Sequence, residues 1–170
     1  MADKLRSAIT MTDEEIMQFL AHSRSATVAT IGPGGVPHLV AMWYAIIDGE
    51  IWIQSKSKSQ KIVNLRRDSR ASVLLEAGRS YECLRGVSFE GQGLVSEKRD
   101  DLWRVAVSIF ERYTGPYRDE FEPVIEGMIH KRTAVRIEVE RVRSWDHRKL
   151  SMESVPMGGT TAPYISEIER

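Results

Sequence analysis

The stretch 51–75 constrains the fold most, because its hydrophobic period changes twice along its length. Residues 51–56 alternate between two sets of side chains, which is the period of a strand. Ile62 and Leu65 then lie three residues apart, as one face of a short helix requires. Residues 71–75 are again apolar and β-prone. The stretch therefore predicts a strand, a loop, a short helix and a second strand.

The loop and the short helix are strongly basic. Six lysines and arginines lie between Lys56 and Arg70, against one acid, Asp68. Hydroxyls and lysines thus gather at the start of a helix, where unpaired backbone N–H groups favour an anion. The pattern predicts the phosphate anchor of a bound cofactor. The alternative is a solvated basic face on which Ser57 or Ser59 only caps the helix.

The chain as a whole has the size and composition of one globular domain with a real core. It has 170 residues, of which 42% are hydrophobic. Its net charge of zero argues against broad binding to nucleic acid. Cys83 is the only cysteine, which fits a reducing compartment. We expect a cytoplasmic protein without a signal peptide or a membrane span.

A single domain is expected over residues 1–150, followed by a C-terminal tail over residues 151–170. The tail contains two prolines, two glycines and few large apolar residues. This composition is typical of an extended or disordered end. The functional alternative is a tail that crosses a partner subunit or covers a site.

Other local signals complete the outline. Thr12 and Glu15 form the pattern of a capping box at the start of an N-terminal helix. The segment 36–47 is apolar on both parities, so both of its faces are expected to be buried. Asp48 and Gly49 predict a hairpin. Strands are predicted over 25–31, 36–47, 51–56, 71–75, 87–95 and 133–145.

A helical pair is predicted before the last strand. Asp100 or Asp101 is expected to cap the first helix. The second covers about 119–129, although Pro123 suits only a first turn, which allows a later start. In the last strand the apolar alternation changes parity, which predicts a β-bulge near 140–141.

These elements together predict a mainly β fold with peripheral helices (α+β), a small six-stranded closed or split β-barrel. Six strands enclose little volume, so side chains are expected to fill the interior. A large ligand must then bind outside the barrel, and a groove between two subunits is the natural place.

The sequence resembles the split β-barrel flavin and deazaflavin oxidoreductases, the pyridoxamine phosphate oxidase-like superfamily with its FMN-binding fold. The resemblance covers about 12–150 and is closest to the members that use coenzyme F420. It is carried by GGVPHLVAMWYAIIDGEIWIQSKSKSQKIVNLRRDSRASVLLE (34–76), LRGVSFEGQG (84–93), RYTGP (112–116) and SWDHRKL (144–150).

The resemblance implies a homodimer with two cofactor sites at the subunit interface. It also implies that the cofactor phosphate lies on the loop and helix start after the third strand. The implied phosphate-binding residues are Ser55, Lys56, Lys58, Ser59, Gln60 and Lys61. The ring is implied to pack against Met42, Trp43 or Tyr44, at least one of which is expected in the core. Arg85 and Gly86 are implied to approach the cofactor or the opposite subunit. Trp145 and Lys149 are implied to complete the site from the second subunit; the alternative is that the terminal aromatic, Trp145, covers the barrel end.

The resemblance implies an oxidoreductase that transfers a hydride from reduced coenzyme F420 to an unsaturated or electrophilic small organic acceptor. The alternatives are an FMN-dependent oxidoreductase of the pyridoxamine phosphate oxidase type and a non-enzymatic flavin- or deazaflavin-binding protein. The sequence alone identifies no catalytic residue, and the spacing of the four histidines is not that of metal ligands. No metal site is expected, and the cofactor is expected to carry the chemistry.

Overall fold

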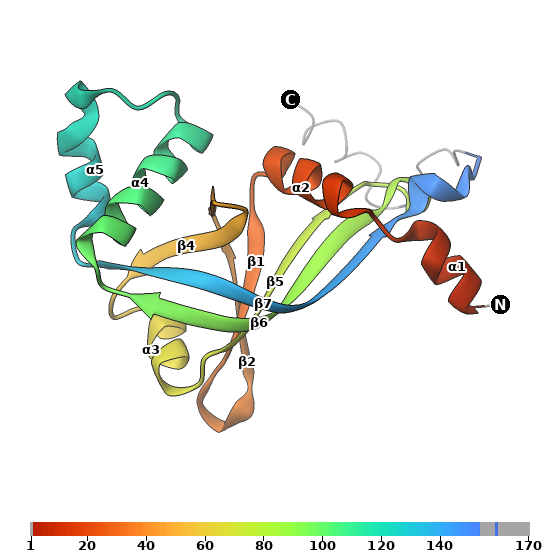
Figure 1. Cartoon of the computed structure of the whole chain (residues 1–170). Helices are drawn as coiled ribbons and strands as arrows, with labels where there is room; N and C mark the ends of the chain where they lie inside the picture. The colour runs from red at the N-terminus through yellow and green to blue at the C-terminus, as the bar shows by residue number, and fades with distance from the viewer. Residues whose placement is uncertain (1, 154–158, 160–170) are drawn as a thin grey trace.

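The protein folds as a curled antiparallel sheet with helices at both ends (Figure 1). The computed structural model describes residues 2–153 and Gly159. The strands are β1 (Ala26–Ile31), β2 (Pro37–Met42), β3 (Ala45–Ile47), β4 (Glu50–Lys56), β5 (Arg70–Ala77), β6 (Arg85–Ser96) and β7 (Arg132–Asp146). The helices are α1 (Ala2–Ile9), α2 (Asp13–His22), α3 (Gln60–Arg67), α4 (Arg99–Tyr113) and α5 (Glu122–Ile129). None of the described helices is long and apolar enough to cross a membrane.

The sheet has seven strands in the order β2-β1-β5-β6-β7-β4-β3, so the prediction of six strands was wrong. The predicted strand 36–47 is broken at residues 43–44, and its two halves lie at opposite edges of the sheet. Tyr44 causes the break. Its hydroxyl donates to the carbonyl oxygens of Leu20 and Ser23 at 2.6 and 2.9 Å, which turns the side chain into the core. Tyr44 is therefore fully buried, as expected for at least one residue of this trio.

Burial on both faces occurs in β4, and not in β2 as predicted. Leu39 on β2 is 62% exposed, because β2 is an edge strand whose outer face no described element covers. In β4, residues 51–55 are all buried. Ile51 and Ile53 lie in the interior of the curled sheet, and Trp52 packs beneath α4 and α5. Two cores on opposite sides of one strand thus replace the single core expected from the sequence.

Several local predictions were confirmed. The reciprocal capping box of Thr12 and Glu15 begins α2, and Asp48 and Gly49 turn the β3–β4 hairpin with φ of 54° and 80°. The register between β6 and β7 shifts so that Glu140 is left out of the pairing, which is the predicted bulge. α5 begins late, at Glu122, in agreement with the position of its proline.

The start of α4 differs from its prediction. The N-cap residue is Lys98, and neither aspartate caps the helix through its side chain. The carboxylate of Asp101 instead accepts from the hydroxyl of Ser96 at 2.5 Å. The predictions for the C-terminal tail lie outside the described residues, apart from 151–153 and 159.

The ribbon formed by β6 and β7 runs the length of the molecule (Figure 1). β4 pairs with β7 only from Arg132 to Arg136, whereas β6 continues its pairing as far as Asp146. The helices α4 and α5 lie at the end where β7 begins, and α1 and α2 lie toward the end where it finishes (Figure 1). The two ends of β7 therefore carry two separate sets of side chains.

Candidate functional site

A cluster of hydroxyl and ammonium groups lies where β4 ends and α3 begins. The Ser55 hydroxyl is 3.0 Å from the Ser59 hydroxyl, and the Lys61 ammonium donates to Ser55 at 3.1 Å. Ser59 occupies the N-cap of α3 without making a side-chain capping bond, so its hydroxyl is free to face Ser55. Three of the predicted phosphate-binding residues thus meet at the positive end of a helix.

A second cation lies beside this cluster. Burial lowers the pKa of the Lys61 ammonium, and the nearby Arg132 guanidinium at the start of β7 lowers it further. Within the described part of the chain, no carboxylate forms an ion pair with Lys61 or Arg132. Two neighbouring cations without a carboxylate partner among the described residues would both be stabilised by a bound anion.

Arg132 also lines a groove of about 500 Å³ between the edge of β2 and the helical pair. Trp43 forms an aromatic wall of this groove, and its indole stacks on Tyr113 with centroids 4.3 Å apart and planes inclined by 4°. The remaining lining is mostly apolar. The groove is lined by Ala41, Met42, Trp43, Gln54, Ile109, Met128 and Arg132.

Gln54 presents an unpaired acceptor in this groove. Its side-chain nitrogen donates to the backbone carbonyl of Met128, but its Oε1 has no partner among the described residues. Gln54 is only 5% exposed, so the unpaired oxygen carries a desolvation cost. A ligand that places an N–H group against Oε1 would remove that cost. The groove therefore combines a planar wall, a buried acceptor and a cation.

The other predicted phosphate-binding residues do not join the cluster. Lys56 and Lys58 are exposed, and no described partner forms an ion pair with either. Gln60 donates to the side chain of Asn64 at 2.8 Å, and Asn64 in turn donates to Thr30 on β1 at 3.0 Å. Asn64 is fully buried, so this chain of bonds fixes α3 on the sheet.

Arg85 lies far from the cluster within one chain. It pairs with Asp146 at the end of β7, whereas Ser55 pairs with Thr133 at the beginning. Thirteen residue steps separate these positions, which corresponds to roughly 40 Å of strand at about 3.3 Å per residue. The Arg85 guanidinium stacks over Phe19 at 5.1 Å. A single chain therefore does not bring Arg85 to the proposed phosphate.

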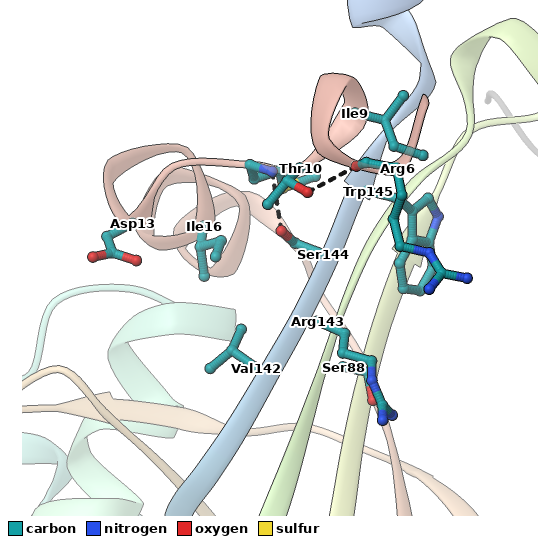
Figure 2. Close-up of a pocket in the computed structure, with 11 residues that line it drawn as sticks. Arg6, Ile9, Thr10, Asp13, Ile16, Ser88, Val142, Arg143, Ser144 and Trp145 are labelled. Atoms are coloured by element: carbon teal, nitrogen blue, oxygen red, sulfur yellow. Dashed lines mark hydrogen bonds between the residues drawn. The ribbon is translucent and has the colours of Figure 1, made fainter. Parts of the chain in front are cut away.

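A larger cavity of about 780 Å³ lies at that distant end, between α1, α2 and the β6–β7 ribbon (Figure 2). Figure 2 shows Val142, Arg143 and Trp145 along the ribbon, with Ile9 and Ile16 on the two helices above it. Gly86 approaches the Trp145 ring closely, since a Cβ atom there would lie 2.3 Å from Cζ2. The cavity contains none of the hydroxyl and ammonium groups of the anion cluster.

Lys149 is held at the same end. Its ammonium donates to the carbonyl oxygen of Thr10 at 2.7 Å and to the Glu15 carboxylate at 2.6 Å. These bonds attach the segment after β7 to the start of α2. Among the described residues, no three side chains of His, Cys, Asp or Glu gather as metal ligands would.

Sequence reasoning did not identify Gln54, Arg132 or Tyr113 as site residues. Gln54 alternates in its strand as a surface residue would, and only the helical pair above it makes it buried. Arg132 lies far from the basic loop in sequence. The one available signal was the RYTGP motif, which contains Tyr113 but gives no hint of its contact with Trp43.

Comparisons with known proteins agree with this architecture. A conserved hypothetical protein of Mycobacterium tuberculosis, Rv2991, is 57% identical, with a TM-score of 0.90 over 92% of this chain and 98% of its own. An F420 reductase is 17% identical, with a TM-score of 0.57 over 74% of this chain and 93% of its own. The heme storage protein HutZ of Vibrio cholerae is 15% identical, with a TM-score of 0.61 over 76% of this chain and 92% of its own. The last two similarities show the fold alone.

No curated protein matches the chain. The family model of pyridoxamine 5'-phosphate oxidase matches residues 12–146, which include the whole sheet, the anion cluster and the groove. This match covers most of the chain and agrees with the split-barrel arrangement of its strands. The chain therefore belongs to the pyridoxamine 5'-phosphate oxidase family.

Proposed function

We propose that this protein is an oxidoreductase that transfers a hydride from reduced coenzyme F420 to a small unsaturated or electrophilic acceptor. The observation that carries the proposal is the uncompensated pair Lys61 and Arg132, located beside a groove with an aromatic wall. A cofactor with an anionic end and a planar ring matches both features.

The residues have distinct roles in binding this cofactor. Ser55 and Ser59 donate hydroxyl hydrogen bonds to the phosphate, and Lys61 adds a charge-assisted one. The unpaired Oε1 of Gln54 accepts from an N–H group of the ring system. The planar face of Trp43 supports the ring. With these assignments the Gln54 Oε1 gains a hydrogen-bond donor, and the anionic end of the cofactor neutralises Lys61 and Arg132.

The bound cofactor would supply the hydride, and the chain's contribution is orientation and electrostatics. The cations stabilise the anionic end and leave the ring in the apolar part of the groove. Solvent supplies the proton that follows the hydride, because the described groove residues include no carboxylate or histidine.

Coenzyme F420 is favoured over FMN by the spare charges of the loop. Lys56 and Lys58 are exposed and lack ion-pair partners among the described residues, so they are available to the acidic glutamyl tail of a deazaflavin. FMN is the alternative cofactor, since the same phosphate anchor and the same acceptor on Gln54 would serve it. A binding protein without catalytic activity requires these contacts too.

We further propose that the working form is a homodimer with a cofactor at the interface. The support is the outer face of β2 and the residues beside it, where Val36, Leu39 and Trp43 are 67%, 62% and 56% exposed. Trp43 belongs to both this face and the groove, so a partner placed here would border the site. Such a partner is the means by which Arg85 would reach a cofactor. We expect the dimer in the cytoplasm, where Cys83 stays reduced.

Parallel titrations of the purified protein with oxidised coenzyme F420 and with FMN test the proposal. We expect F420 to bind more tightly than FMN. If FMN binds more tightly, FMN and not F420 is the cofactor of this protein. The Lys56→Gln, Lys58→Gln double variant should reduce the preference for F420 over FMN, because only F420 carries the glutamyl tail. Oxidation of reduced F420 only when an organic acceptor is added would distinguish a reductase from a binding protein.

A further inference from the structure

We infer that Tyr113, supported by Arg112, is a positioning residue that holds the Trp43 indole as the flat wall of the groove. Trp43 lies in the two-residue break between β2 and β3, where no strand pairing fixes its direction. Its ring nevertheless lies parallel to that of Tyr113 within 4°. The identity of the ligand on this wall rests on the proposed function, whereas the positioning itself does not.

The contacts around Tyr113 form a continuous support from α2 to the groove. The backbone N–H of Tyr44 donates to the Tyr113 hydroxyl at 3.2 Å, which ties this ring to the residue after Trp43. The Arg112 guanidinium donates to the Tyr44 hydroxyl at 2.8 Å and to the carbonyl oxygen of Leu20 at 2.6 Å. The end of α4 is thus attached to the strand break and to the end of α2.

This support leaves one face of the indole free. Tyr113 covers the other face, yet Trp43 remains 56% exposed and lines the groove. A side chain at a strand break without such a neighbour would have several rotamers to choose from, and ligand binding would have to select one. Stacking on Tyr113 removes that choice in advance, so the wall is already flat when a planar ring arrives.

The first test requires no ligand. The tryptophan bands of the near-ultraviolet circular dichroism spectrum and the acrylamide quenching of tryptophan fluorescence should both change in Tyr113→Leu. These tryptophan signals should not change when the same substitution is made in Trp43→Leu. Tyr113→Phe keeps the stacked ring and loses only the bond from the Tyr44 N–H, so its change should be smaller than that of Tyr113→Leu. If Tyr113→Leu does not fold, Tyr113→Met provides the same comparison. Equal changes in the presence and absence of Trp43 would overturn the inference.

The second test measures affinity for whichever of F420 and FMN binds the parent protein. Tyr113→Leu should weaken binding by about three- to tenfold, the size of one aromatic pair contribution, and should have no further effect in the Trp43→Leu background. Tyr117→Leu is the matched control, because it removes a ring that contacts Trp103 at 6.2 Å outside the groove.

The outcomes separate the inference from the proposed function. If the spectroscopic coupling is present but the parent binds neither cofactor, the proposed function fails and the positioning role stands. If the parent binds a cofactor and Tyr113→Leu binds it equally well, the positioning role is refuted and the proposed function stands.

Discussion

Replacing Lys61 by methionine separates the contribution of this lysine to folding from its contribution to anion binding. Methionine keeps the apolar stem and removes the ammonium. In the folded protein, burial and Arg132 both lower the pKa of Lys61 below its ordinary value of 10.5. When a base has a lower pKa in the folded than in the unfolded state, the protein becomes more stable as the pH rises toward the pKa of the unfolded state. At neutral pH the charged lysine therefore opposes folding.

The two effects of the substitution differ in size. Without ligand, the variant loses the Lys61–Ser55 hydrogen bond of 3.1 Å, a contribution of about 0.5–1.5 kcal/mol. It also loses the desolvation penalty of the partly buried ammonium and the repulsion from Arg132, both of which oppose folding. The lost hydrogen bond and the lost penalties therefore act in opposite directions on the free energy of unfolding. With a phosphate bound, the loss of a charge-assisted hydrogen bond costs about 1.5–3 kcal/mol, or roughly 10- to 150-fold in affinity.

Urea denaturation of the unliganded protein and calorimetric titration with the bound cofactor measure the two quantities separately. We expect the free energy of unfolding to change by less than about 1 kcal/mol, while the affinity falls by at least about tenfold. Arg66→Met is the matched control, because Arg66 lies on the same helix but forms an ion pair with Glu97. An unchanged cofactor affinity in Lys61→Met, with folding intact, would refute the reasoning.

Two further predictions concern the scaffold. Gly86→Ala should lower the free energy of unfolding in urea by about 1–3 kcal/mol, because the new Cβ would lie 2.3 Å from the Trp145 ring and 2.9 Å from the carbonyl oxygen of Leu75. Gly127→Ala, with open space around it, should not destabilise the protein, and an equal loss in both variants would contradict the steric explanation. Burial raises the pKa of Tyr44 from 10.0 to about 12, so its contribution to stability is complete below pH 10 and is lost as the pH rises through about 12. Tyr44→Phe should flatten the pH dependence of unfolding in that range, and an unchanged slope would show that Tyr44 is not its source.

The sequence was informative where a local pattern alone determines the structure. The change of period over residues 51–75, the capping box at Thr12 and the hairpin at Asp48 and Gly49 all depend on neighbours in the chain. The cluster of Ser55, Ser59 and Lys61 was predictable for the same reason, since its members lie within seven consecutive residues of the chain.

The features that escaped prediction depend on contacts between distant segments. The break after Met42 arises because the Tyr44 hydroxyl finds carbonyl oxygens on α2, and nothing in an apolar run of strand-forming residues indicates this. Gln54 and Arg132 become site residues only when β4 and β7 pair and α5 covers them. The resemblance implies that Arg85 approaches the cofactor or the opposite subunit; within one chain it lies far from the loop, so this expectation stays a prediction about the dimer.

The break at residues 43–44 also determines how the barrel is closed. β2 and β3 are the two edge strands of the sheet. They are joined by the two residues of the break and not by hydrogen bonds between strands. The distance between these two edges can change without breaking the hydrogen bonds of any pair of strands. Side chains hold this break instead: the Tyr44 hydroxyl bonds to the end of α2, and the Tyr113 hydroxyl on α4 accepts from the backbone N–H of Tyr44. Met42 and Trp43 line the groove, so a change in the spacing of the two sheet edges would also change the shape of the groove.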